Sequence, residues 1–337
     1  MNYSRSIFYK LFLITVLGVL LSLILTDSSL ENKLKNVILI LVLVFFEICL
    51  SIDNAVINAK ILMKMPIVWQ KIFISFGIPI SVFVMRLLFP LCIVSFTSSI
   101  SLSEVIFLFI NDPISYKDNF EKSFSKIYAF GASFLLLVFL KFFVEEESKH
   151  NFINIIGNNK FLKLLRQYPG LYIILGLIIS LIFIVPMNSE KNLIYFSLYG
   201  ILLHEILGII NYLCNNFYSI FLRYGLLSFI YIEILDAIFS LDSVIGAFAI
   251  SSNIFVIVIG LGIGAIYVRF FTIFFIRESV LLKFLFLESL AYYSIGFFSL
   301  IMFLKIDNVI SEFYIFVLFF LYLFLLYFLN KIKDNKK

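Results

Sequence analysis

The chain has 337 residues, of which 62% are hydrophobic and 14% charged, and its mean hydropathy is +1.09. Soluble domains average about 25% charged residues, so this composition excludes a water-soluble globular protein and predicts an all-α polytopic membrane protein. The net charge of +5 does not indicate nucleic-acid binding, because the basic residues fall mostly in short segments between apolar runs.

Ten apolar runs, most of them long enough to cross a lipid bilayer as a helix, follow one another along the chain. The first resembles a signal sequence, but it is followed by no clear small-x-small cleavage site, which favours a retained span. The longest loops are expected at 97–126 and 145–170. The predicted spans are 7–25, 37–59, 72–96, 127–144, 171–186, 194–213, 226–250, 254–276, 284–304 and 313–330.

The charges of the loops predict the orientation of these spans. If both termini are cytoplasmic, most of the 26 Lys and Arg lie in cytoplasmic segments, as the positive-inside rule requires. The three cysteines, Cys49, Cys92 and Cys214, lie in apolar runs. Their odd number and position argue against a disulfide framework and against a thiolate metal cluster.

An internal repeat is visible in the sequence. EICLSIDNAV (47–56) aligns with DAIFSLDSVI (236–245), and GIPISVFVMRLLF (77–89) aligns with GLGIGAIYVRFFT (260–272). A weaker third match joins GASFLLLVFLK to GFFSLIMFLK. The aligned polar and charged pairs are Glu47 with Asp236, Ser51 with Ser240, Asp53 with Asp242, Asn54 with Ser243, and Arg86 with Arg269. Spans two to four therefore correspond to spans seven to nine.

Five spans separate the members of each matched pair. Because this number is odd, the two halves would cross the membrane in opposite directions. This predicts two inverted-topology repeats with a site near the bilayer midplane, as in many secondary transporters. The predicted parts are 1–36 (N-terminal span and loop), 37–144 (first repeat core), 145–193 (connecting loop and span), 194–312 (second repeat core) and 313–337 (last span and basic tail).

Polar residues form a stripe on each repeated helix. At 100° per residue, Ser51, Asn54 and Asn58 all lie within about 40° of Glu47. In the second repeat, Asp236, Ser240 and Ser243 form the same stripe, with Glu233 about 60° away. Polar side chains inside a span are expected to face protein or a water-filled cavity rather than lipid.

Asp53 and Asp242 lie about 120° away from these stripes in an ideal helix. Two explanations remain open. Either the helix unwinds at the Ser-x-Asp step, or the two aspartates reach sideways to Arg86 and Arg269 in the neighbouring spans, where a guanidinium can bind a carboxylate through two hydrogen bonds.

The acids predict a cation as the ligand. Each ionised acid at a span centre costs about 2.5–3.5 kcal/mol on insertion scales, and the two repeated arginines offset only part of this cost. The negative excess suits one divalent cation, or protons. Carboxylate, amide and hydroxyl oxygens, with no patterned His or Cys, favour Mn²⁺, Mg²⁺ or Ca²⁺ over copper or zinc.

Structural roles are the alternative for several of these residues. Single Asn or Ser side chains in spans often serve only to join helices. Acids repeated at the same position in both halves have no such simple explanation. His204 and Glu205 have no counterpart in the other half, and they form either a structural pair or a proton relay.

FFEICLSIDNAV and LDAIFSLDSVIGAFAI resemble the two motifs of the TerC family, bacterial membrane proteins named for tellurium resistance that include manganese exporters. The resemblance covers roughly residues 37–305 and is closest to a longer, divergent branch. It implies a multi-pass protein of the bacterial inner (cytoplasmic) membrane, with inverted repeats and divalent-metal export, chiefly of manganese. It places the metal-site role on Glu47, Asp53, Asn54, Asp236 and Asp242, whereas Ser243 stands where an asparagine would match Asn54.

The sequence thus predicts a secondary transporter that exports a divalent metal as its substrate, chiefly manganese, with proton exchange as a plausible coupling. It predicts no organic cofactor and no nucleic-acid partner. The alternative is a non-transporting membrane partner that delivers metal to exported enzymes or supports envelope or tellurite stress resistance. An intramembrane enzyme is not expected, because the sequence has no Gly-x-Gly-Asp, Gly-x-Ser-x-Gly or His-Glu-x-x-His pattern.

Overall fold

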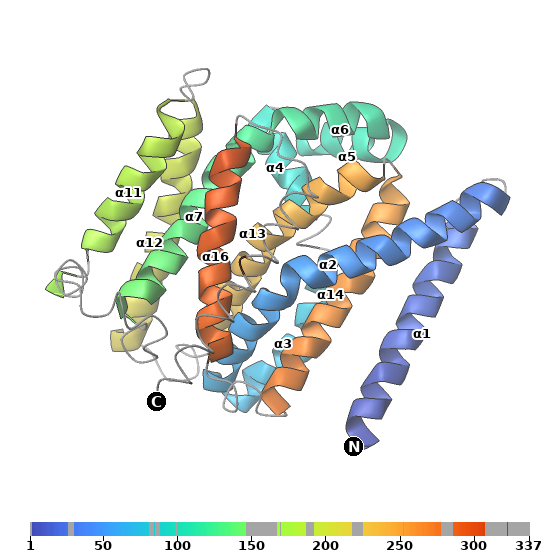
Figure 1. The fold of residues 1–337 in the computed structure, drawn as a ribbon, viewed down its shortest axis with the longest axis horizontal. Helices are drawn as coiled ribbons and strands as arrows, with labels where there is room; N and C mark the ends of the chain where they lie inside the picture. Colours follow the sequence, from blue (N-terminus) through green and yellow to red (C-terminus); the bar gives the residue numbers. More distant parts are fainter. Residues whose placement is uncertain are drawn as a thin grey trace. The chain divides into compact units, whose positions relative to one another are not determined.

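A computed structural model describes most of the chain. The described residues are 2–25, 30–80, 84, 88–98, 100–145, 167, 168, 170–186, 192–217, 225–251, 253–277, 286–306 and 322. Within these ranges the protein is all-helical, with twelve helices and no strand (Figure 1). The all-α prediction is confirmed for this part of the chain.

The helices follow the predicted spans closely. The predicted span 72–96 contains parts of two helices, and residues 81–83 and 85–87 between them lie outside the described residues. The predicted last span, 313–330, also lies outside the described residues apart from Tyr322. The helices are α1 (Asn2–Leu25), α2 (Leu30–Lys64), α3 (Ile67–Pro79), α4 (Phe89–Ser98), α5 (Leu102–Asn111), α6 (Pro113–Lys122), α7 (Phe124–Glu145), α11 (Leu171–Ile184), α12 (Asn192–Phe217), α13 (Leu227–Ile250), α14 (Ile254–Arg277) and α16 (Phe286–Lys305).

Four described helical segments are long and apolar enough to cross a membrane: Lys33–Lys64, Phe124–Val144, Asn192–Ile210 and Ile254–Arg277. A fifth span results if α4 and α5, which are bent by 117° at a short break, are counted together. Large apolar side chains such as Phe12, Phe45 and Phe107 are exposed on the described helices. Exposed apolar surface of this extent fits a protein whose solvent is lipid.

The chain divides into two compact units, each built from segments far apart in sequence. Unit 1 consists of Met1–Ser123 and Cys214–Val280, and unit 2 of Phe124–Leu213 and Leu281–Lys337. The predicted repeat cores, 37–144 and 194–312, therefore each contribute helices to both units.

In unit 1, α14 packs along α2, and α13 and α1 pack against the same pair. Two glycines of α14 allow a close approach to α2. A Cβ on Gly260 would lie 2.6 Å from Leu43 Cβ, and a Cβ on Gly264 would lie 2.5 Å from Glu47 Cβ. Glycines four residues apart commonly allow such contact between membrane helices. The contact holds the polar stripe of α2 against α14.

In unit 2, α7 packs against α16 and α11. The rings of Phe142 and Tyr292 stack with their centroids 3.9 Å apart, and Ser299 Oγ donates a 2.9 Å hydrogen bond to the carbonyl oxygen of Ala132. The buried Lys305 lies over the Tyr128 ring at 5.4 Å. These contacts join the two helices that carry the weaker third sequence match.

The segment 97–126, predicted as a loop, instead contains α5 and α6. Ser101 is the N-cap of α5, and its side chain accepts a hydrogen bond from the backbone N–H of Glu104. Asp112 is the N-cap of α6, and its side chain accepts from the backbone N–H of Ser115, with Pro113 at the first helical position. Both are standard helix-start signals. The segment is helical rather than irregular, because polarity alone overlooks these caps; its place as a connection between two spans stays a prediction.

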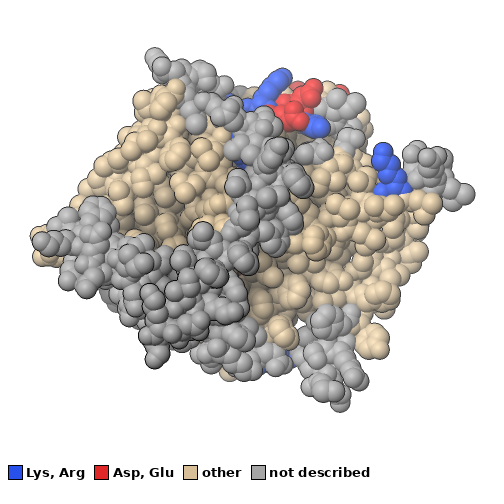
Figure 2. Space-filling view, viewed as in Figure 1, with Lys and Arg blue, Asp and Glu red and all other residues tan. Residues whose placement is uncertain are grey.

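Charged side chains are sparse on the face of the protein shown in Figure 2. The described Lys, Arg, Asp and Glu residues visible there gather mainly at the edge where α5 and α6 lie, and most of the other described surface is uncharged. In α6, Lys117 and Glu121 form an exposed ion pair at 3.7 Å. We therefore expect α6 to lie in water rather than in the hydrocarbon of the membrane.

Candidate functional site

The polar stripe of α2 is buried in unit 1, as expected for polar side chains in a span. Glu47 and Asn58 are 0% and 1% exposed, and Ser51 and Asn54 are also buried. Asp53, which lies off the stripe in an ideal helix, is buried too. All residues from 53 to 60 are buried, so this part of α2 has no exposed side. Helix α2 therefore turns a broad polar surface toward protein rather than lipid.

Helical structure is unbroken through both Ser-x-Asp steps. Residues 51–53 lie inside α2 and residues 240–242 lie inside α13. The unwinding alternative for Asp53 and Asp242 is therefore wrong. All backbone groups of these turns remain within the helix, which is the favoured arrangement in lipid.

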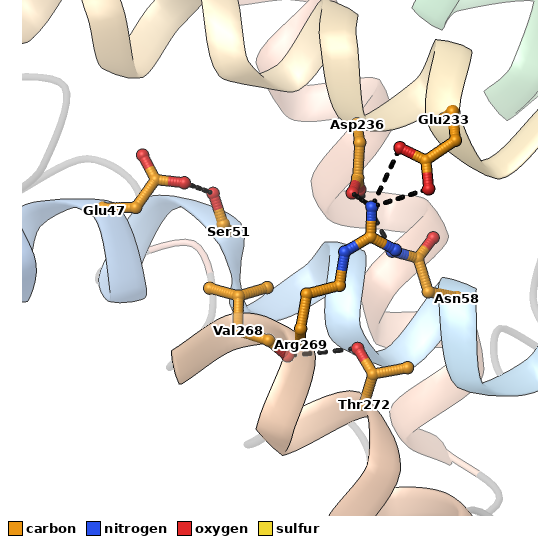
Figure 3. A network of polar contacts seen from close by, with 8 residues as sticks. All are labelled: Glu47, Ser51, Asn58, Glu233, Asp236, Val268, Arg269 and Thr272. Carbon is orange, nitrogen blue, oxygen red and sulfur yellow. Dashed lines mark hydrogen bonds and ion pairs between the residues drawn. The ribbon is translucent and has the colours of Figure 1, made fainter. Parts of the chain in front are cut away.

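The centre of the site is Arg269 on α14, whose side chain is 2% exposed. Its Nη2 atom lies 2.9 and 3.0 Å from the two carboxylate oxygens of Glu233 and 2.7 Å from Oδ2 of Asp236. Both acids belong to α13 and are buried. Figure 3 shows the two carboxylates converging on the end of the guanidinium.

Helix α2 joins this network through Asn58, whose Nδ2 donates a 3.0 Å hydrogen bond to Oδ1 of Asp236 (Figure 3). The Asp236 carboxylate therefore contacts an amide of α2 and a guanidinium of α14. Three helices, α2, α13 and α14, meet at this one carboxylate.

Helix α3 closes another side of the network. The Arg269 guanidinium lies over the Phe73 ring at 4.1 Å, a cation–π contact with a residue that is itself fully buried. Gly77, one turn later, lies beside Glu233, because a Cβ there would be in ordinary van der Waals contact with Oε1 of that acid at 3.4 Å. The sequence analysis did not identify Phe73, but the alignment of Gly77 with Gly260 marked this turn of the chain.

Glu47 forms a second pair on α2. Ser51 Oγ donates a 2.8 Å hydrogen bond to Oε1 of Glu47, so two members of the predicted stripe are joined to each other. In Figure 3 this pair lies to one side of the Arg269 network. On α13, Ser243 Oγ donates to the carbonyl oxygen of Ser240, so this hydroxyl hydrogen is used within its own helix.

The structure thus brings together Glu233, Asp236, Arg269 and Asn58 from the predicted set. The sequence predicted Asp242 as a partner of Arg269; the partners seen in the structure are Asp236, six residues earlier, and Glu233. The side chain of Asp242 and the whole of Arg86 lie outside what the structure describes. The pairing of Asp53 with Arg86 and of Asp242 with Arg269 therefore stays a prediction.

No group of three or more His, Cys, Asp or Glu that could hold a metal ion occurs among the described residues. Because the side chain of Asp242 lies outside the described residues, the assembly of the full predicted ligand set stays a prediction. Two carboxylates of α13 lie together at Arg269, and Asn58 turns its amide nitrogen toward Asp236.

Unit 2 holds a separate polar group. The buried His204 places Nδ1 2.8 Å from Oε1 of Glu205, and Tyr172 on α11 donates a 3.4 Å hydrogen bond to the same oxygen. The rings of Phe134 and Tyr172 contact the imidazole edge-on. Aromatic packing and a satisfied hydrogen bond are the features expected of a structural pair; a proton-relay role stays a prediction.

Comparison with known proteins gives one result. A family model described as "Protein of unknown function (DUF475)" matches residues 52–337, which is most of the chain and includes Asn58, Glu233, Asp236 and Arg269. Searches of curated proteins and of solved structures found no match.

Proposed function

The chain belongs to the DUF475 family, and we propose that it is a secondary transporter that exports a divalent metal cation, chiefly manganese. The observation that carries the proposal is the buried network of Arg269 with Glu233 and Asp236. Two acids share one guanidinium away from water, and Glu47 and Asp53 lie buried on α2. Buried charge inside membrane helices is costly and commonly marks an ion pathway.

The donors available favour a hard cation. Carboxylates from α13 and amides from α2 are oxygen ligands of the kind preferred by Mn²⁺, Mg²⁺ and Ca²⁺. In the described part of the chain no thiolate or imidazole accompanies them in the network. The resemblance to TerC proteins supports manganese among these metals.

The proposed mechanism uses the duplicated sequence. Ten spans form two inverted repeats in the bacterial cytoplasmic membrane, with both termini cytoplasmic. The site contains the acids of both repeats, Asp53 and Asp242 included, and rocking of one repeat against the other exposes it to each side in turn. Proton return through the same carboxylates is compatible with this cycle.

The test is expression in a manganese-sensitive bacterium that lacks its own exporters. The intact chain should lower cellular manganese and restore growth in excess manganese, whereas Asp53→Asn and Asp242→Asn should do neither, because each removes a carboxylate from the proposed site. Immunoblots of the membrane fraction control for protein amount.

An intact chain that reaches the membrane but leaves manganese content and tolerance unchanged would contradict manganese export. The same assay with other divalent metals then decides whether another cation is the substrate. If no metal is exported while exported metalloenzymes lose activity without the chain, the non-transporting delivery role is supported instead.

A further inference from the structure

Three carboxylate oxygens converge on a single nitrogen atom of Arg269. Both oxygens of Glu233 and one of Asp236 lie 2.7–3.0 Å from Nη2. In the part of the chain that the structure describes, Nε and Nη1 of the same guanidinium are buried and have no hydrogen-bond partner. Among the described residues, the hydrogen bonds and the ion pairs of this guanidinium all involve Nη2.

This arrangement differs from a usual structural pair of arginine and carboxylate. In such a pair, the two oxygens of a carboxylate bind two different N–H groups of the planar guanidinium fork. A buried donor without an acceptor is unfavourable, so the network leaves part of the guanidinium unsatisfied. Oxygens directed at one point instead resemble the ligand shell of a metal ion.

We propose that the position of Arg269 Nη2 is the binding position of the transported cation, and that Arg269 and the substrate exclude each other there. The proposal rests on the proposed function and makes it specific. Glu233 and Asp236 are the principal ligands, Asn58 orients Asp236, and Arg269 is a tethered cation that occupies the position when no substrate is bound.

Charge then explains selectivity for divalent cations. Glu233 and Asp236 bring two carboxylates to this position, and Arg269 brings one positive charge. A monovalent ion carries the same single positive charge as the guanidinium, so replacing one with the other leaves the charge on the two acids equally neutralised. A divalent ion neutralises both acids, so it alone gains from displacing Arg269.

The full-length protein in detergent micelles provides the test, with ⁵⁴Mn²⁺ equilibrium dialysis as the binding measurement. Arg269→Gln should bind Mn²⁺ about tenfold more tightly than the wild type, because the competitor is gone. It should also become sensitive to competition by Na⁺, which the wild type resists. Glu233→Gln should bind Mn²⁺ about tenfold more weakly, because a charged ligand is lost.

Arg277→Gln is the matched control, since Arg277 ends the same helix and is exposed. Its affinity and its Na⁺ insensitivity should equal those of the wild type. If Arg269→Gln fails to fold, the double variant Glu233→Gln with Arg269→Gln replaces it, since it removes one charge of each sign. This variant should bind Mn²⁺ more tightly than Glu233→Gln alone.

Two failures are distinguishable. A wild-type protein that neither binds nor transports any divalent cation overturns the proposed function itself. A wild-type protein that binds and exports Mn²⁺, while a folded Arg269→Gln shows unchanged or weaker affinity and no Na⁺ competition, overturns only the competition by Arg269. Equal affinities of Glu233→Gln and the double variant overturn it as well.

Discussion

Asp236 shows how individual side chains make buried charge tolerable in this protein. Asn58 donates a hydrogen bond to Oδ1 of Asp236, and Oδ2 forms an ion pair with Arg269, so each oxygen has a partner. Removing one partner of such a buried pair generally costs far more than the pair contributes, because the other charge is left uncompensated. Each contact to Asp236 is therefore expected to matter for both stability and transport.

Asn58→Ala should lower the free energy of unfolding by about 1–2 kcal/mol, because it removes the amide that α2 donates to a buried carboxylate. Thermal unfolding of the purified protein in detergent measures the change. Ser243→Ala is the comparison, since its hydroxyl donates a hydrogen bond to a carbonyl of its own helix. Equal losses in the two variants would show that the link between α2 and α13 has no special role.

Glu47→Gln should reduce metal export by about tenfold or more, the equivalent of roughly 1.4 kcal/mol of lost cation binding. The protein should still fold, because the amide oxygen of glutamine can accept the Ser51 hydrogen bond that Glu47 accepts now. Cellular manganese content gives the readout. Normal export by a Glu47→Gln variant present in the membrane would remove Glu47 from the site.

At the level of elements, contact between α14 and α2 sets the position of the site. Gly260 and Gly264 bring the two helices close enough for the polar stripe of α2 to lie in the same packed region as Arg269. The polar stripe lies on α2 and Arg269 lies on α14, so the site depends on this contact.

Gly264→Ala should destabilise the protein by about 1–3 kcal/mol, since the added methyl overlaps Glu47 and forces the helices apart. Gly208→Ala on α12 is the matched control. Nothing lies within 4 Å of a Cβ there, so the change should be neutral or raise stability by up to about 1 kcal/mol through helix propensity. Melting temperatures in detergent measure both. A Gly264→Ala protein as stable as Gly208→Ala would contradict the close-contact explanation.

For the whole molecule, the topology is open to direct measurement. Each compact unit combines helices from both predicted repeats, which is an arrangement that a duplicated chain can form. The positive-inside rule places the exposed Lys64, at the end of α2, in the cytoplasm, and Lys117 of α6 outside.

After replacement of the three native cysteines, Lys117→Cys should react with a membrane-impermeant maleimide in intact cells, because α6 lies on the outer side in the ten-span topology. Lys64→Cys should react only after the cells are lysed. Tags at the two termini should likewise require lysis for detection. Labelling of Lys64→Cys in intact cells would contradict the ten-span topology.

The sequence by itself determined where most of the long apolar helices lie and that the stripe of α2 is buried. Apolar runs leave the backbone in lipid no alternative to the helix, and polar residues at helical spacing must turn toward protein. Only the tertiary structure decided that Arg269 binds Asp236 and Glu233, and that Asn58 completes the network. Periodicity orders side chains around one helix, whereas the partner of a charge depends on how closely and at which turn three helices meet.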